Sequence, residues 1–171
     1  MQTQKSAIQS LQCSKFRKFC LSPKLAICFL FFSCTYQGIA QQAKLFESDE
    51  ILEITLKCDM KALQRERNTD KSTFREASIL YQEDGIESQI PIRIRTRGRF
   101  RRKSSNCQYP PLLLNFSKGS TPEGSFFEGQ DRIKLVTPCR GDDFVVNEYL
   151  VYRLYNLITP KSFRARLVRM V

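Results

Sequence analysis

Arginine recurs at every second position in one segment of this 171-residue chain. The alternating residues are Arg93, Arg95, Arg97, Arg99 and Arg101, and uncharged residues fall between them. On a β-strand, alternate residues point to the same face, so this spacing predicts a row of guanidinium groups on one side of a sheet. Guanidinium groups bind phosphate and carboxylate groups through paired hydrogen bonds. The row is therefore either a binding face for an anionic ligand or a solvated face whose charges pair with acidic residues on neighbouring strands.

Gly98 interrupts this row. A glycine inside a strand pattern indicates a bulge or a turn, where the backbone can approach a ligand closely. If the row forms a binding site, we expect the ligand to be contacted by Arg95, Arg97, Gly98 and Arg99.

The chain contains no histidine. This absence excludes a Ser-His-Asp triad, a Cys-His dyad and every metal site that needs an imidazole ligand. Phosphoryl transfer stays open, because it depends on Lys, Asp, Asn and metal ions. Nucleic acid is the weakest candidate ligand, because the arginine row lacks the series of aromatic side chains on which bases stack. No specific nucleic-acid partner is expected.

Residues 1–40 have the composition of a secretory signal peptide. They contain five basic and no acidic residues, an unbroken apolar run at 25–32, and small residues at Gly38 and Ala40. We expect export to the periplasm or the extracellular space, with cleavage after Ala40 and a mature chain of residues 41–171. Lipoprotein processing at Cys34 is one alternative, and an uncleaved anchor or a buried helix is another. The run at 25–32 is shorter than the roughly 20 residues that span a bilayer, so no transmembrane helix is expected in the mature chain.

Cleavage would remove five of the 28 basic residues and none of the 17 acidic residues, which lowers the formal net charge from +11 to +6. It would leave three cysteines, Cys58, Cys107 and Cys139. Cys107 and Cys139 lie in predicted loops, whereas Cys58 lies inside a strand pattern and is expected to be a small buried residue. Because export permits disulfides, we predict a bond between Cys107 and Cys139, with three free thiols as the alternative. The sequence contains no Cys-x-x-Cys spacing, so its cysteines do not indicate a metal site.

The remaining pattern predicts an α+β domain. Alternating or short apolar runs predict strands at 51–58, 73–81, 90–96, 112–116, 133–136 and 162–171, with a hairpin turn at 83–85. Helical turns are expected at 59–67, with Asp59 as the N-cap, and a helix is expected at 144–158, ended by Pro160. We expect a mostly antiparallel, twisted sheet. Since the longer helix is apolar on nearly all sides, we predict that it is buried at the centre of the domain.

The sequence stops inside the last predicted strand. We therefore expect 41–171 to be an incomplete domain, truncated at its C-terminus. Such a domain would be the N-terminal part of a longer protein, and the alternative is an α+β domain built around one central helix.

Six segments carry a resemblance to known proteins. They are RTRGRFRR at 95–102, NC at 106–107, PPLLLNF at 110–116, FEGQDRIKLV at 127–136, NEYLVYRLYNLI at 147–158 and SFRARL at 162–167. Together they resemble a family of uncharacterised exported bacterial proteins. More distantly, they are similar to the N-terminal half of the CotH (spore coat protein H) group of atypical kinases. The resemblance covers about residues 45–171.

The CotH resemblance implies a fold like the N-terminal lobe of a kinase, with ATP and magnesium as cofactors. In kinases a strand lysine pairs with a helix glutamate to hold the nucleotide phosphates. Lys134 and Glu148 follow in this order, 14 residues apart. In the alternative reading, Lys134 is a surface lysine and Glu148 interacts favourably with the helix dipole. A glycine-rich phosphate loop and a catalytic loop are absent from the sequence, so any catalytic residues would lie in a further lobe.

The sequence thus leaves two candidate functions. The first is an exported protein that resembles the N-terminal portion of CotH-like kinases and binds a nucleotide or another anion. The alternative is a non-catalytic module of the cell envelope, which binds an anionic ligand or protein through the arginine-rich strand face. No catalytic residue is assigned in either case, and the ligand and the oligomeric state stay open.

Overall fold

A computed structural model describes residues 4–10, 44–67, 71–117, 119–139 and 141–171. The described strands are β1 (Gln4–Ser10), β2 (Leu52–Lys57), β3 (Arg75–Glu83), β4 (Ile86–Thr96), β5 (Leu112–Phe116), β6 (Arg132–Val136) and β7 (Ala165–Met170). The described helices are the 3-10 turn η1 (Lys44–Phe46), α1 (Met60–Arg65) and α2 (Asp142–Ile158). The predicted α+β class is confirmed, and each predicted strand or helix after residue 50 overlaps an observed one.

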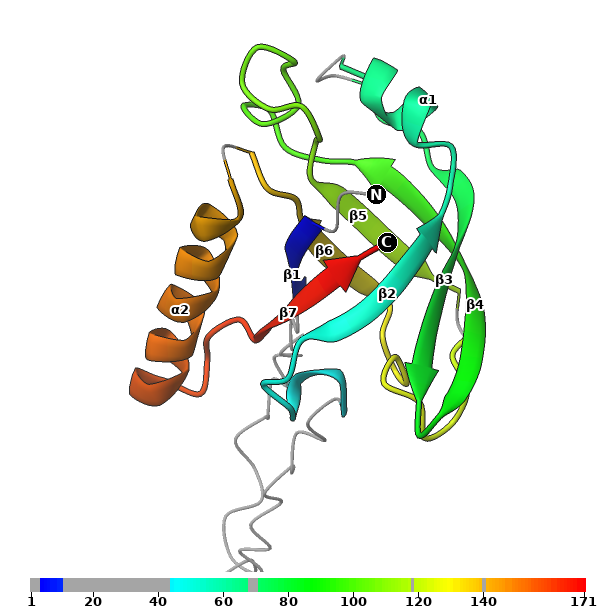
Figure 1. Ribbon diagram of the computed structural model, residues 1–171, viewed down its shortest axis with the longest axis vertical. Coiled ribbons are helices and arrows are strands. Elements are labelled where there is room, and N and C mark those ends of the chain that lie inside the picture. The colour runs from blue at the N-terminus through cyan, green and yellow to red at the C-terminus, as the bar shows by residue number, and fades with distance from the viewer. Residues whose placement is uncertain (1–3, 11–43, 68–70, 118, 140) are drawn as a thin grey trace, which may run out of the picture.

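The strands form a closed barrel in the order β1-β6-β5-β4-β3-β2-β7 (Figure 1). Strands β2 to β7 make up one curled sheet, and β1 lies between its two ends, β6 and β7. All neighbouring strands are antiparallel except β2 and β7, which are parallel. The prediction of a mostly antiparallel sheet is therefore confirmed.

Local signals in the sequence explain the first two connections of the sheet. β3 and β4 are joined by Asp84 and Gly85, whose φ angles of 52° and 79° are those of a two-residue hairpin turn. Between β2 and β3, Asp59 caps α1 by accepting a 2.9 Å hydrogen bond from the backbone N–H of Ala62. Both the turn and the cap were predicted.

The hydrophobic core fills the inside of the barrel. Alternate residues of the strands supply most of it, with Leu52, Ile54, Ile79, Tyr81, Ile90, Ile92, Ile94, Leu112, Leu114, Phe116, Ile133, Leu135 and Val168 all buried. Leu45, Leu63 and Phe127, each 0% exposed, add to the same core from η1, α1 and the loop before β6. The barrel interior is thus filled by side chains, as expected for a small barrel.

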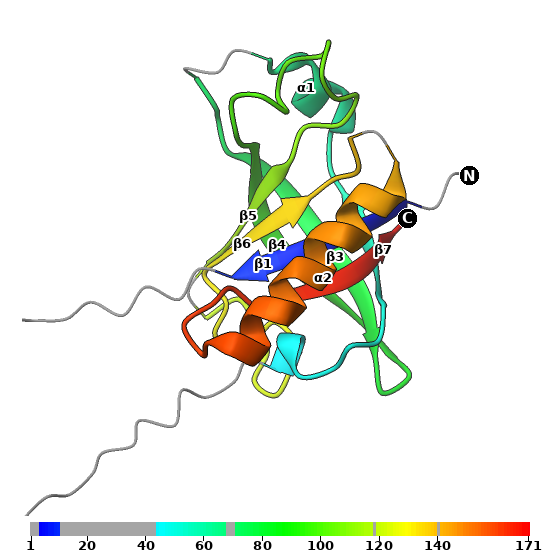
Figure 2. The same ribbon diagram turned by 90° about the vertical axis from the view of Figure 1, so that its left-hand side faces the viewer.

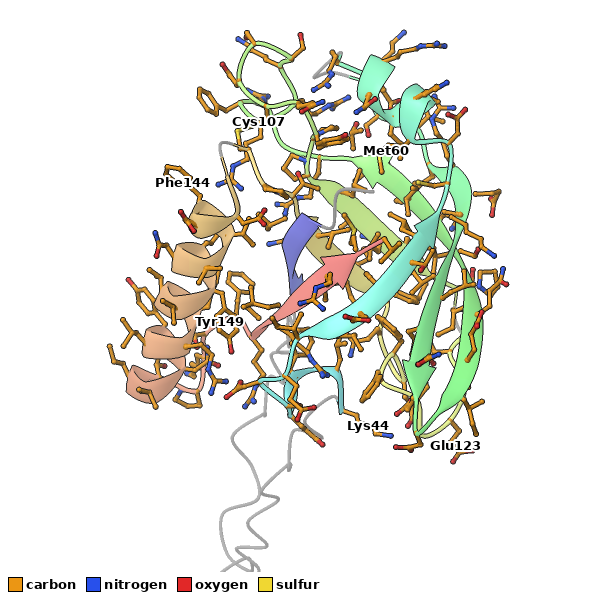
Figure 3. The ribbon with its side chains drawn as sticks, in the orientation of Figure 1. Lys44, Met60, Cys107, Glu123, Phe144 and Tyr149 are labelled. Atoms are coloured by element: carbon orange, nitrogen blue, oxygen red, sulfur yellow. A yellow bond between two sulfur atoms is a disulfide. The ribbon has the colours of Figure 1, made fainter. Side chains whose placement is uncertain are left out.

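The sequence pattern predicted that helix α2 is buried at the centre of the domain, and this prediction is wrong. The helix lies outside the barrel, against β1 and β7 (Figure 2). Only Val145 and Tyr149 are buried, and Tyr149 projects from α2 toward the barrel (Figure 3). The helix leaves a large apolar surface exposed, formed by Phe144, Leu150, Val151, Leu154, Tyr155, Leu157 and Ile158. The barrel fills its own interior, so an apolar helix has no place inside it.

Polar contacts attach α2 to the segment before β2. The Tyr149 hydroxyl donates to one carboxylate oxygen of Asp49 at 3.2 Å, and Arg153 donates to the other at 2.7 Å. Burial, and then the Asp49 charge, raise the pKa of Tyr149 above its ordinary value. This hydroxyl therefore stays protonated and keeps donating at neutral pH.

The N-terminal predictions fall mostly outside the described residues. Residues 11–43 are not described, and they include the cleavage site after Ala40, the apolar run at 25–32 and the lipid-attachment site at Cys34. Residues 4–10 are described and form β1. Within the described part of the chain, no helix is both long and apolar enough to cross a membrane.

Candidate anion-binding site

The outer surface of β4, β5 and β6 carries basic side chains in register. In an antiparallel sheet, directly paired residues lie on the same face. Arg95 pairs with Leu113, and Leu113 pairs with Lys134. Arg93 lies two residues before Arg95 on the same face, and the backbone N–H of Arg97 continues the pairing with a 2.9 Å hydrogen bond to the Pro111 carbonyl. We call Arg93, Arg95, Arg97 and Lys134 the cationic face.

The predicted five-residue arginine row is only partly formed. β4 ends at Thr96, and Gly98 has a φ of +81°, a left-handed conformation that turns the chain away from the strand direction. Gly98 thus forms the predicted turn. Because the alternation of faces ends with the strand, Arg99 is exposed in the following turn and does not extend the row. Arg101 instead reaches α2, where it forms an ion pair with Glu148 at 3.4 Å.

The loop at 97–111, which carries Arg97, is fixed to its surroundings by a disulfide. The predicted bond between Cys107 and Cys139 is confirmed, with their Cα atoms 4.7 Å apart. Cys139 precedes the start of α2, so the bond holds the loop beside the N-terminal end of this helix (Figure 3). Cys58 is a free thiol that packs against the core, and burial raises its pKa.

A second anchor of the same loop is Arg67. Its guanidinium donates to the carbonyl oxygens of Arg102, Cys107 and Gln108 at 2.9, 3.2 and 2.7 Å. The Thr137 hydroxyl donates to the Tyr109 carbonyl at 2.9 Å on the other side of the loop. These bonds pair partly buried backbone carbonyls of the loop, and they hold the loop that carries Arg97 in a defined position.

Phe74 lies under two members of the cationic face. The guanidinium carbons of Arg95 and Arg93 lie 4.8 and 5.5 Å from the centre of its ring. Such cation–π contacts stabilise the charge and orient the side chain. The Arg95 Nε atom is buried and has no hydrogen-bond partner among the described residues, so Arg95 retains an unused donor.

Arg97 and Lys134 are the electrostatically least favourable members of this face. Burial lowers the pKa of Arg97; the nearby Tyr152 and Glu148 raise it in part, and Arg101 lowers it further. Burial also lowers the pKa of Lys134, and the positive charge of Arg97 lowers it further. Each charge is thus partly removed from water while another positive charge lies close by, an arrangement that a bound anion would relieve.

Glu148 does not pair with Lys134 as the kinase resemblance implied. In the part of the chain that the structure describes, no carboxylate oxygen lies within 4.0 Å of the Lys134 amine, and Glu148 pairs with Arg101. Lys134 is instead placed over the ring of Phe163, with its Nζ atom 4.6 Å from the ring centre. Phe163 also contacts Tyr152 edge-on.

The structure thus brings together Arg95, Arg97 and Lys134 from the predicted site, with Gly98 next to them and Arg99 outside. Sequence reasoning missed Phe74 and Phe163. Phe74 directly precedes β3, and the pairing of Arg75 with Ile94 brings it beside Arg95, so the predicted hairpin could have located it. Phe163 reaches Lys134 from a separate element, and no local pattern marks that contact.

Within the described residues, no three His, Cys, Asp or Glu side chains are grouped so that they could hold a metal ion. No protein-family model, no curated protein and no solved structure matches this chain. The resemblance to CotH-like proteins therefore stays a prediction from sequence motifs.

Proposed function

We propose that this protein is an exported binding module of the cell envelope, which holds an anionic ligand on its cationic face. The observation that carries this proposal is that four basic side chains share one surface and, within the described part of the chain, form no salt bridge there, although Glu76 of β3 is paired with Arg93 and Glu148 lies near Arg97. Among the described residues, none of Arg93, Arg95, Arg97 and Lys134 forms a salt bridge with a carboxylate. A face whose charges are paired with acidic residues of neighbouring strands, the alternative reading of the arginine row, would show such salt bridges.

The spacing of the cations favours a ligand with several negative groups. Arg93 and Arg97 are four residues apart along an extended chain, which corresponds to about 13 Å. Lys134 lies two strands from Arg95, or roughly 10 Å away. A single small anion cannot contact all of them, whereas a linear polyanion with repeated phosphate or carboxylate groups can.

The test is a binding titration of the full chain, because residues 4–10 contribute a strand to the barrel. Inorganic polyphosphate and polyglutamate serve as the phosphate and carboxylate probes. We expect saturable binding that weakens as salt is added, since the contacts are ionic. Replacing both central cations, Arg97→Gln with Lys134→Gln, removes two charge-assisted contacts and should lower the affinity by about tenfold or more.

The matched control is the double variant Lys57→Gln with Lys61→Gln. Both lysines are exposed and lie on β2 and α1, away from the cationic face, and the change in net charge is the same. Affinity in this variant should stay within about twofold of that of the unaltered chain. If the two double variants weaken binding equally, binding reflects net charge alone and the site is wrong.

ATP with magnesium is a second candidate ligand, favoured by Phe163. This ring is 39% exposed beside Lys134, so an aromatic surface for a base lies next to a cation for phosphate. Calorimetric titration should then show saturable ATP binding, lost in Lys134→Ala and weakened in Phe163→Leu, while polyphosphate binding tolerates Phe163→Leu. No heat at millimolar ATP would contradict nucleotide binding and leave the polyanion proposal standing.

The envelope location and the CotH relationship are parts of the same proposal. They are supported by the signal-like composition of residues 1–40 and by the motifs at 95–102, 106–107, 110–116, 127–136, 147–158 and 162–167.

A further inference from the structure

β1 differs from the other strands in its connection to the barrel. Strands β2 to β7 form a continuous curled sheet by themselves, in the order β6-β5-β4-β3-β2-β7. β1 pairs antiparallel with both ends of this sheet, over 133–136 of β6 and 165–170 of β7 (Figure 2). Residues 11–43 separate it from η1 in the sequence. One seven-residue strand from a distant part of the chain therefore closes the barrel.

We propose that the space between β6 and β7 is a strand-acceptor site, which an extended segment of a partner polypeptide occupies after residues 1–40 have been removed. The proposal rests on the proposed export, since signal cleavage would take β1 away. It would leave the facing backbone N–H and C=O groups of β6 and β7 unpaired, which is unfavourable. Only another polypeptide backbone has donors and acceptors at the spacing that pairs with both rows.

The register defines what a fitting segment looks like. We number the inserted segment by the residues of β6 with which it pairs. The residue of the segment that pairs with Leu135 points into the barrel core and must be apolar. The preceding position lies beside Val136 and Leu167, which pack with Val145 of α2, so it requires a small residue. The following position lies beside Lys134, where an acidic residue would complement an amine without a carboxylate partner among the described residues. The expected order is small, apolar, acidic.

The experiment opens the site in protein that has already folded. A recognition sequence for a site-specific protease is inserted after Ala40 of the full chain, and the purified protein is cut. A fluorescent peptide with the sequence of residues 4–10 is then titrated into cut and uncut protein, with anisotropy as the readout. Hydrogen exchange of the β6 and β7 amides is followed in parallel.

We expect the peptide to bind the cut chain saturably and the uncut chain weakly, because the tethered β1 competes in the uncut chain. The peptide variant Ala7→Pro should not bind, since proline cannot pair inside a central strand. The variant Gln9→Glu should bind roughly three- to fivefold more tightly through Lys134, and this gain should vanish in the Lys134→Gln protein. When the cleaved fragment of residues 1–40 is removed, the backbone amides of β6 and β7 should exchange their hydrogens faster. Adding the peptide should restore their protection from exchange.

Three results would overturn the proposal. Equal binding to cut and uncut chains would locate the peptide elsewhere. Protected β6 and β7 amides after removal of the fragment, without peptide binding, would show that these strands pair directly. Loss of protection in the β3–β4 hairpin as well would show that β1 is a permanent part of the fold. The polyanion titration has a separate readout, so failure of the anion-binding proposal is distinguishable from each of these.

Discussion

Lys134 is the residue at which the proposed site responds to pH. A lysine binds an anion only while its amine is protonated, so its contribution is complete below its pKa and is lost as the pH rises through it. Burial and the charge of Arg97 lower this pKa. The loss therefore begins at a lower pH than for an ordinary exposed lysine.

Substituting Lys134→Arg tests this directly. Arginine stays protonated across the accessible range, so the variant should keep its polyphosphate affinity on the alkaline side of neutrality, where the unaltered chain loses affinity. Titrations at a series of pH values, at constant ionic strength, give the two profiles. Lys57→Arg is the control and should follow the unaltered chain. Superimposable profiles for Lys134→Arg and the unaltered chain would exclude Lys134 from the contact.

Sequence alternation predicted the candidate site correctly only as far as strand β4 extends. Alternation correctly placed Arg93 and Arg95 on one face, because both lie inside β4. It failed for Arg99, because the strand ends at Thr96 and the pattern alone does not mark that end. The order and spacing of Lys134 and Glu148 suggested a pair, but spacing does not reveal that Arg101 competes for the same carboxylate.

At the scale of elements, the 97–111 loop depends on its disulfide. The bond between Cys107 and Cys139 has a sequence separation of 32, and closing a loop of this size restricts the unfolded chain. In the chain-entropy model, the double variant Cys107→Ser with Cys139→Ser should lower the free energy of unfolding by about 3–4 kcal/mol. Urea denaturation of both proteins measures this difference. An unchanged midpoint and slope would show that Arg67 and Thr137 hold the loop without the disulfide.

The two faces of α2 should respond differently to substitution. Leu157 is 84% exposed, so Leu157→Gln should change the free energy of unfolding by less than about 0.5 kcal/mol. Val145 is 2% exposed and packs on Val136, so Val145→Ala should cost about 1–3 kcal/mol. Thermal or urea denaturation checks both values. A large loss in Leu157→Gln would mean that the outer face of α2 is covered in solution.

The strands and helices were easier to predict than their arrangement. Asp59, Gly85 and the alternating apolar residues are local signals, and the strand and helix positions follow from them. The position of α2 is not a local property. Its sequence shows that it is apolar on most sides, and only the packed barrel shows that no interior space is left for it.

At the scale of the whole molecule, closure of the barrel could not be predicted. It requires the parallel pairing of β2 with β7 and the insertion of β1, and both join residues more than 100 positions apart. The pairs that close the barrel were invisible to sequence patterns, which report on neighbours along the chain.

The proposed export predicts a defined mature N-terminus. Protein recovered from the exported fraction of an expressing bacterium should begin at Gln41, because Gly38 and Ala40 form the expected cleavage signal. Mass spectrometry of the intact protein gives the result. Ala40→Leu should block processing and retain the full chain in the cells, whereas Gln42→Leu, beyond the cleaved bond, should not. A lipid-modified chain that begins at Cys34 would instead establish the lipoprotein alternative.

The position of β7 between β1 and β2 has a consequence for how the protein is made. β7 is the last of the described strands along the chain, and it joins β1 to β2. Without β7 the barrel would stay open between these two strands. Residues up to Met170 must therefore have left the ribosome before closure becomes possible, and such long-range pairing is intrinsically slow.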